Sequence, residues 1–272
     1  MEDDTQAIQF LRAFREQFYA SALGHRKDSQ FALLEAVLCA SGPESLVRLS
    51  LAPPFQRCWS SACDALAAGS LAATRLRQLL VPSLPPPPAD ARELWVVDGT
   101  IWPRPSAGTS PERTYCHRVA PGIPQSGVVP GWEYQWLVAV PEAQGSWVLP
   151  LDVRRRRPDS ASPTALALEQ VHAALAARAT GGATTGATTG AMTGPTTGGA
   201  ATGAGKVAPR PLVVFDSGYD PAQLASAEET QQADFLVRLA RNRRCFRAPD
   251  PYSGWGAPGK HGDVFRLSDP AT

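Results

Sequence analysis

Apolar residues recur at helical spacing through the N-terminal part of the chain. They form two stripes, Ile8, Leu11, Phe14 and Phe18, and then Phe31, Leu34, Val37 and Leu38. An apolar residue at every third or fourth position makes one face of an amphipathic helix. Similar stretches cover about 44–51 and 55–68, and a last one ends near Leu80. The pattern predicts an all-α N-terminal domain over residues 1–81.

A run of prolines ends this pattern. Residues 82–92 hold five prolines, which fix the backbone φ angle, remove hydrogen-bond donors and favour an extended chain. Neither a helix nor a sheet can continue through such a run. The segment is therefore predicted to be a linker.

Beyond the linker, short runs are rich in β-branched and aromatic residues. These predicted strands lie at 94–97, 114–119, 134–140, 147–153, 212–215 and 235–239. Helical patterns occupy 165–178 and 221–232. Several strands followed by helix, strand, helix and strand predict an α/β domain over 93–272, with a mixed sheet flanked by helices.

One segment of this domain has low complexity. Residues 180–205 form a near-repeat of Gly, Ala and Thr, typified by TGGATTGATTGAMTG. Such a segment has almost no large apolar side chains to pack into a core. We expect a disordered loop without a chemical role.

Composition and charge narrow the class of protein. Hydrophobic residues make up 43% and charged residues 19% of the chain, as in an ordinary globular protein. The formal net charge is +1, so binding of a polyanion must depend on local clusters. The five cysteines include no C-x-x-C pair, and neither a secretory leader nor a membrane span is evident. We expect a cytoplasmic protein that does not enter membranes.

Two predicted strands deliver an aspartate at their ends. The apolar run 93–97 is followed by Asp98, and the run 211–215 by Asp216. Ligands of open α/β sheets bind beyond the carboxyl ends of the strands. The alternative is that both are turn residues, since Asp before Gly or Ser commonly starts a turn.

The residues around both aspartates favour the functional interpretation. They read LWVVDGTIWPRP, SPERTYCHRV, PGWEYQWLVAV, VVFDSGYDPAQLA and ADFLVRLARNRR. In this order they resemble the DDE superfamily of bacterial insertion-sequence transposases, over most of residues 93–247. The resemblance implies a ribonuclease H-like core, in which the first and fourth strands are neighbours and bring Asp98 and Asp216 together. It also gives Tyr219, of the Asp-x-Gly-Tyr pattern, a supporting role in the loop.

The resemblance implies a reaction and its partners. Two close carboxylates repel each other unless they share a cation, and oxygen ligands select Mg²⁺ or Mn²⁺. Two such ions support phosphodiester cleavage and strand joining in DNA transposition. The implied partners are transposon ends and target DNA, with a homo-oligomer on DNA, in the bacterial cytosol near the nucleoid.

The family pattern is incomplete in this sequence. Members of the family complete the metal site with a glutamate on a helix beyond the fifth strand, here 235–239. Glu228 and Glu229 precede that strand, while Asp263 and Asp269 lie in Gly- and Pro-rich sequence. We carry none of them over, and expect a C-terminally truncated, inactive core.

Basic and aromatic residues give further candidates. An arginine cluster that could bind DNA phosphates, or be only a solvated loop, comprises Arg238, Arg241, Arg243, Arg244 and Arg247. The run 154–157 is expected to be simply exposed. Trp132, Trp136 and Trp147 could stack on bases, but aromatic residues within strands are more often core, and we expect core residues.

Two other functions stay open. The first is a DNA-binding transposase remnant without catalysis, which would lack metal-dependent nicking. The second is a metal-dependent hydrolase of small phosphates, against which salt-sensitive DNA affinity would argue.

Overall fold

The computed structural model describes residues 2–42, 44–84, 92–106, 109–118, 127–141, 147–185, 209–240, 243–252, 254–257 and 259–266. The chain divides into two compact units. One is Met1–Pro86 with Ala173–Gly203, and the other is Pro87–His172 with Ala204–Thr272.

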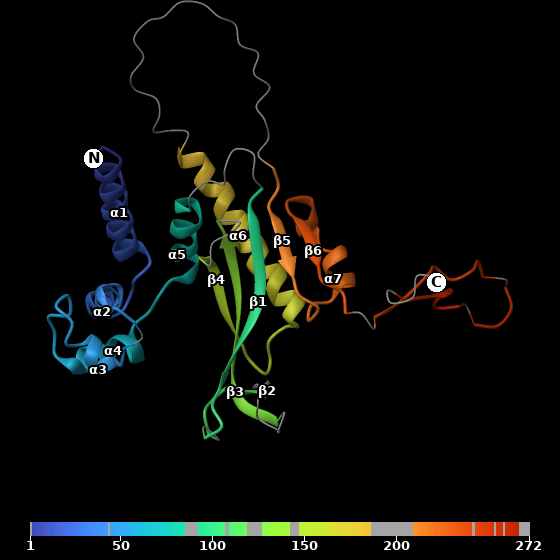
Figure 1. Cartoon of the computed structure of the whole chain (residues 1–272), viewed down its shortest axis with the longest axis horizontal. Helices are drawn as coiled ribbons and strands as arrows, with labels where there is room; N and C mark the ends of the chain where they lie inside the picture. The colour runs from blue at the N-terminus through green and yellow to red at the C-terminus, as the bar shows by residue number, and fades with distance from the viewer. Residues whose placement is uncertain are drawn as a thin grey trace, which may run out of the picture. The chain divides into compact units, whose positions relative to one another are not determined.

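Helices dominate the described residues up to 84 (Figure 1). They are α1 (Glu2–Ser21), α2 (Lys27–Cys39), α3 (Leu46–Leu49), α4 (Trp59–Ala68), α5 (Ala73–Leu80) and the 3-10 helix η1 (Val81–Ser83). Ser45 caps α3, because its side chain accepts a hydrogen bond from the Arg48 backbone N–H at 3.3 Å. The only β pairing in this described stretch is an isolated bridge between Leu23 and Leu71.

The apolar core of this unit includes a different face of α2 from the one predicted. Its buried members are Leu33, Ala36, Phe55, Ala62 and Ala65. Leu34, Val37 and Leu38 of the predicted stripe are 42%, 50% and 78% exposed. The prediction of that stripe is wrong because nearly every position of FALLEAVL is apolar, so helical spacing alone does not select a face.

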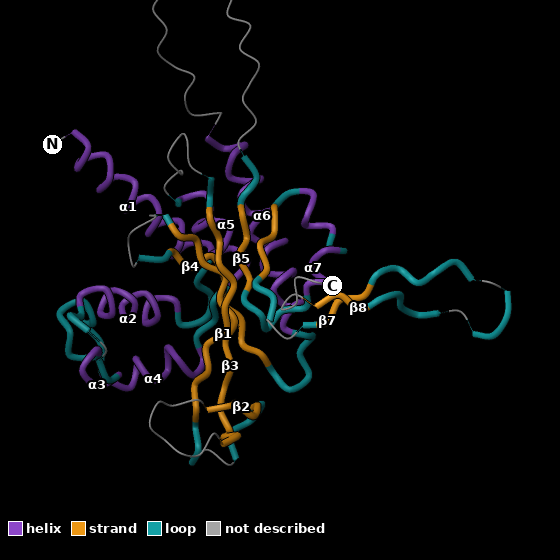
Figure 2. The backbone as a smooth tube through the Cα atoms, turned by 45° about the vertical axis from the view of Figure 1, so that its right-hand side comes forward, coloured by secondary structure: helices purple, strands orange, loops and turns teal. Residues whose placement is uncertain are grey.

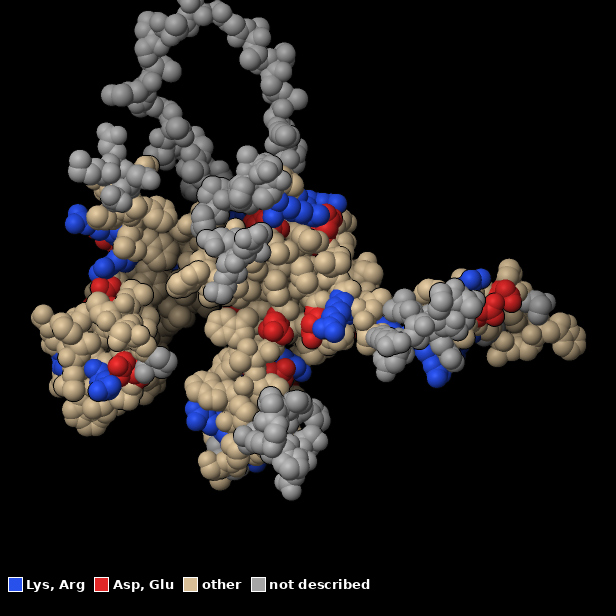
Figure 3. Space-filling model, viewed as in Figure 1, with Lys and Arg blue, Asp and Glu red and all other residues tan. Residues whose placement is uncertain are grey.

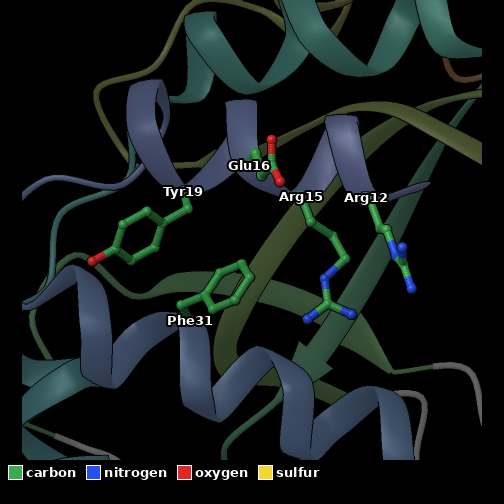
Figure 4. Close-up of a pocket in the computed structure, with 5 residues that line it drawn as sticks. All are labelled: Arg12, Arg15, Glu16, Tyr19 and Phe31. Carbon is green, nitrogen blue, oxygen red and sulfur yellow. The ribbon is translucent and has the colours of Figure 1, made fainter. Parts of the chain in front are cut away.

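Aromatic and charged side chains occupy the space between α1 and α2 (Figure 4). Tyr19 packs edge-on against Phe31 with ring centroids 5.3 Å apart. The Arg15 guanidinium lies 5.6 Å from the Phe31 ring centroid and pairs with Glu35 at 2.6 Å. Phe31 therefore faces α1, and these contacts hold the two helices together.

The second unit is built around a mixed sheet (Figure 1). Its strands are β1 (Leu94–Pro103), β2 (Thr114–Arg118), β3 (Gly127–Val140), β4 (Leu149–Arg156), β5 (Leu212–Phe215) and β6 (Asp234–Val237). The strand order is β2-β3-β1-β5-β6, and β4 also pairs with β3. β3 is antiparallel to its three partners, whereas β5 is parallel to β1 and β6. The predicted mixed sheet with flanking helices is confirmed.

The first part of helix α6 (Pro163–Thr185), up to His172, packs against one face of this sheet. The core between them includes Trp95, Val97, Leu137, Ala139, Val213, Phe215, Leu166, Ala167 and Val171. Within it, the Gln135 side-chain amide donates to the Gln170 side-chain oxygen at 3.0 Å, and the Gln170 amide donates to the Gln135 backbone carbonyl at 3.1 Å. These two buried amides satisfy each other, so they fix the register of α6 on the sheet.

β1 and β3 continue beyond the body of the sheet as a paired extension to which β2 adds (Figure 2). Both strands are longer than predicted, and their pairing runs on from Asp98 opposite Trp136 to Pro103 opposite Gly131. A Cβ at Gly131 would stand 2.6 Å from the Trp102 carbonyl oxygen. Glycine is therefore needed where the two backbones approach this closely.

The predicted loop at 180–205 starts too early, because α6 includes residues 180–185. The Thr180 hydroxyl donates to the Ala176 carbonyl at 2.9 Å. An existing helix gains one backbone hydrogen bond for each residue it adds, so α6 continues into this segment although Gly and Thr, which predominate in TGGATT, are poor helix formers. The rest of the segment, 186–205, lies outside the described residues.

Two further elements differ from the expectation after β5. The helix predicted at 221–232 is divided into α7 (Pro221–Ala225) and the 3-10 helix η2 (Glu228–Gln231). Between them, the Ser226 hydroxyl donates to the Gln223 carbonyl at 3.1 Å, a local bond that competes with helix continuation. Near the C-terminus, β7 (Arg244–Phe246) and β8 (Val264–Arg266) pair as a separate two-stranded sheet that the sequence pattern did not predict.

Of the three tryptophans expected in the core, two are half-buried and one is exposed. Trp132 and Trp136 are half-buried on β3, whereas Trp147 is 76% exposed. The core prediction for Trp147 is wrong because β4 begins at Leu149, so Trp147 precedes the sheet.

None of the helices in the described ranges is both long and apolar enough to cross a membrane. All five cysteines are free thiols.

Candidate active site

Asp98 and Asp216 lie beside each other where the pairing of β1 with β5 ends, Asp98 within β1 and Asp216 directly after β5. The last parallel pair of β1 and β5 is Val97 with Phe215, so each aspartate is the next residue of its chain. Neighbouring strands are about 4.8 Å apart. This pairing therefore brings together two residues separated by 118 positions (216 − 98).

Acidic side chains gather next to basic ones where the body of the sheet passes into the extension (Figure 3). Both aspartates are exposed there. They follow the carboxyl end of the parallel pairing between β1 and β5, the side on which open α/β sheets bind their ligands.

Each of the two carboxylates is oriented by a nearby backbone amide. Oδ1 of Asp98 accepts from the Gly99 N–H at 2.7 Å, and Oδ1 of Asp216 accepts from the Gly218 N–H at 2.8 Å. The second bond closes an Asx turn, and a Cβ at Gly218 would stand 3.0 Å from the same Oδ1. The turn interpretation and the functional one are thus compatible at Asp216. Within the described ranges, neither Oδ2 atom forms a hydrogen bond or ion pair, so both can bind a cation.

Tyr219 packs beside the two aspartates. It is only 6% exposed, and its ring lies edge-on to Phe215 at 5.4 Å between centroids. Burial raises the pKa of its hydroxyl above the ordinary value, and the negative charges of Asp216 and Asp98 raise that pKa further. Tyr219 therefore stays neutral at physiological pH, as suits a residue that supports the loop after Asp216.

We expect the ring of Tyr219 to matter more for stability than its hydroxyl. Tyr219→Phe should change the free energy of unfolding by no more than about 1 kcal/mol, because only the hydroxyl is lost. Tyr219→Ala should lower it by about 3 kcal/mol, because it leaves a cavity against Phe215. Urea denaturation measures both values. An equal loss in the two variants would show instead that the hydroxyl holds the loop.

An ion pair that the sequence analysis missed lies close to the aspartates. Glu133 on β3 and Arg156 on β4 are cross-strand partners joined by a hydrogen bond. Oε1 of Glu133 is 3.6 Å from the place where a Cβ of Gly99 would lie. Both charges also act on the Tyr219 hydroxyl, since Arg156 lowers its pKa and Glu133 raises it. The only sequence signal was the arginine run of which Arg156 is part.

That run, 154–157, is not simply exposed as predicted. The side chains of Arg154, Arg155 and Arg156 are each no more than 28% exposed. Arg154 pairs with Asp152 at 3.0 Å and with Glu169 at 2.7 Å, and Arg155 and Arg157 both pair with Glu112. The prediction is wrong because β4 continues to Arg156, so these side chains face partners on neighbouring elements.

The donor set of Asp98 and Asp216 suits a hard divalent cation. Carboxylate oxygens are the ligands that Mg²⁺ and Mn²⁺ favour, and one oxygen of each aspartate is available. No group of three or more His, Cys, Asp or Glu side chains within the described ranges is placed to hold a metal ion. A metal ion at this position would therefore have two carboxylate ligands among the described residues.

The described members of the predicted arginine cluster belong to different parts of the chain after β6. Arg238 follows β6, and its backbone N–H donates to the Phe215 carbonyl at 2.9 Å, which places it beside Asp216. Arg243 lies 3.9 Å from Asp220. Arg244 begins β7 and Arg247 follows it, whereas Arg241 lies outside the described residues. Arg238 is thus the member that the strand register brings nearest to the aspartates.

The acidic residues set aside in the sequence lie elsewhere. Glu228 and Glu229 belong to η2, which leads into the beginning of β6, the end opposite Asp216. Asp263 directly precedes β8, and Asp269 lies outside the described residues. None of the described three is beside Asp98 and Asp216.

Comparison with known families gives one match. The model of the family described as DDE superfamily endonuclease matches residues 18–272, which include both aspartates, Tyr219 and Arg238. No curated protein and no solved structure matches the chain. The match extends over nearly the whole sequence, and the chain therefore belongs to the DDE superfamily of endonucleases.

Proposed function

We propose that this chain is a transposase-type DNA nuclease, built to cut and join phosphodiester bonds with divalent metal ions. The observation that carries the proposal is the position of Asp98 and Asp216, each the next residue after the last parallel pair of β1 and β5. The order β4-β3-β1-β5-β6 supports a ribonuclease H-like core. When β2 of the extension is left out, β1 and β5 are the first and fourth strands, which are neighbours in such a core. Membership of an endonuclease superfamily implies DNA as the substrate.

The chain's own residues would prepare the site for this chemistry. Mg²⁺ or Mn²⁺ ions held by Asp98 and Asp216 would supply activation of the attacking oxygen and stabilisation of the leaving oxygen. Backbone amides orient both carboxylates through their Oδ1 atoms and leave the Oδ2 atoms for the ions. Arg156, held in place by Glu133, adds a positive charge near Tyr219, on which the charges of both aspartates also act.

Arg238 is the candidate for positioning DNA at this site. Its backbone is fixed to β5 by the hydrogen bond to the Phe215 carbonyl, and its side chain is exposed. An arginine beside the metal ligands can bind a phosphate next to the bond that is cut.

Binding of duplex DNA at several salt concentrations tests this role. Replacing an arginine that contacts a phosphate should weaken binding of any sequence and reduce the salt slope by about one. We expect this result for Arg238→Gln in a fluorescence anisotropy titration. The matched control is Arg210→Gln, which removes an exposed charge just before β5 that is already paired with Asp234 at 2.8 Å.

Failure of the parent chain to bind DNA with salt-sensitive affinity would contradict the proposed function. Equal losses in both variants would reject the DNA-positioning role of Arg238 but would leave the proposed function standing.

A second candidate function, DNA binding without cleavage, is favoured by the lack of a three-ligand metal group among the described residues.

A further inference from the structure

The face of β1 that carries Asp98 also carries a row of aromatic side chains. Alternate residues of a strand point to the same face, so Thr100 and Trp102 share the face of Asp98. Their partners on β3 are Trp136 opposite Asp98, Tyr134 opposite Thr100, and Trp132 opposite Trp102. Cross-strand partners lie on the same face. One face of the β1–β3 pair is therefore aromatic from the aspartate out into the extension.

Arginines join these aromatic side chains at the far end of the row. Trp102 contacts Trp132 edge-on at 6.2 Å and Tyr134 at 6.4 Å between ring centroids. The Arg104 guanidinium lies 4.5 Å from the Trp102 ring centroid and 5.8 Å from that of Trp132. The Arg155 guanidinium lies 5.2 Å from the Trp132 ring centroid. We call Trp102, Arg104, Trp132, Tyr134 and Arg155 the aromatic–arginine platform.

The platform is not closed off as a core would be. Trp102 is 50% exposed, and Arg104 is exposed and forms no ion pair within the described ranges. Nε1 of Trp132 and Nε of Arg155 are buried without a hydrogen-bond partner in the described part of the chain. Because these two nitrogen atoms are buried, the groups that a ligand can reach are the exposed ring of Trp102 and the exposed guanidinium of Arg104.

The chemistry of the platform fits one class of ligand. Exposed aromatic rings stack on bases of any sequence, and arginines both bind phosphates and strengthen stacking. Bases are available for stacking only where a strand is unpaired. Trp102 lies four residues beyond Asp98 on the same strand, about 13 Å at the usual rise per residue. A strand on the platform would thus pass directly towards the aspartates.

We propose that the aromatic–arginine platform binds an unpaired DNA strand and leads it to Asp98 and Asp216. The inference rests on the proposed function for its DNA substrate. It adds that the substrate is locally single-stranded on the extension side of the site, and that Trp102 and Arg104 determine this preference. Both act by positioning the strand and not in the chemical step.

Titration of the full chain with a short oligothymidylate, followed by fluorescence anisotropy, tests the proposal. One aromatic–base stack is worth about 1–3 kcal/mol, so Trp102→Ala should weaken binding about tenfold. Trp102→Phe should recover most of this loss because a ring remains, and Arg104→Gln should weaken binding and lower its salt dependence. The matched control is Trp147→Ala, since Trp147 is 76% exposed but outside the platform.

The same titration with a duplex of equal length tests this proposal separately from the proposed function on which it rests. Trp102→Ala should bind the duplex as the parent does, and near-ultraviolet circular dichroism should show that the variant is folded. Equal affinity of Trp102→Ala and Trp147→Ala for the single strand would overturn the platform while leaving the nuclease proposal intact. Absence of DNA binding by the parent would contradict both.

Discussion

Phe215→Ala is expected to lower the free energy of unfolding by about 3–5 kcal/mol, the range found when a buried phenylalanine is truncated. Phe215 is 1% exposed, and its ring contacts Tyr219 at 5.4 Å and Phe235 at 5.2 Å. The cavity would open directly before Asp216, so the carboxylate should also lose its fixed position. Domains of this kind are stable by only about 5–15 kcal/mol, so this single change removes a large fraction of the total.

Urea denaturation monitored by circular dichroism measures this effect. Leu236→Ala is the matched control, because Leu236 on the neighbouring strand β6 is 55% exposed and should change stability by only about 0.5 kcal/mol. Phe215→Leu keeps most of the volume, and the variant should remain folded if Phe215→Ala does not. A loss no larger in Phe215→Ala than in Leu236→Ala would mean that the ring does not hold the two strands together.

The body of the sheet could be predicted from sequence because the strand segments there are short apolar runs separated by turn residues. The run before Asp98 and the run before Asp216 each form a buried strand, and the predicted helix at 165–178 lies within α6. The extension could not be predicted, because strand pairing beyond Asp98 depends on close backbone contact at Gly131 and not on alternating hydrophobicity. The buried face of α2 was missed for a related reason, since an apolar helix offers more than one stripe.

The candidate site was predictable only where residues follow strands directly. Asp98 follows the apolar stretch of β1 that pairs with β5, and Asp216 follows β5, so the parallel pairing of these two stretches is enough to bring the aspartates together. Glu133 lies within β3 and Arg156 at the end of β4, and their contact depends on a cross-strand register that no local pattern specifies. The same holds for the arginines near the C-terminus, because the unpredicted strand β7 places Arg244 in a different sheet from the one that Arg238 follows.

The purified 272-residue chain is expected to bind Mn²⁺ weakly and to nick supercoiled plasmid negligibly. Two aspartates leave much of the coordination shell of an ion to water, and no described group of three ligands completes it. Isothermal titration calorimetry with Mn²⁺ alone measures the binding separately from any cleavage. Asp98→Asn and Asp216→Asn should each abolish the weak signal, because one remaining carboxylate cannot hold the ion.

Asp159→Asn is the control, since Asp159 is an exposed turn residue after β4 and its replacement should leave the Mn²⁺ titration unchanged. Nicking by the parent that disappears in both site variants would contradict the expected inactivity and show that a third ligand exists. The nicking activity of Glu133→Gln then shows whether Glu133 is this third ligand. Loss of nicking in that variant would mean that Glu133 leaves Arg156 to join the metal site, whereas retained nicking would place the ligand outside the described ranges, where Asp269 lies. In either case the two aspartates would remain the fixed part of the site, because the pairing of β1 with β5 holds them there before any ion binds.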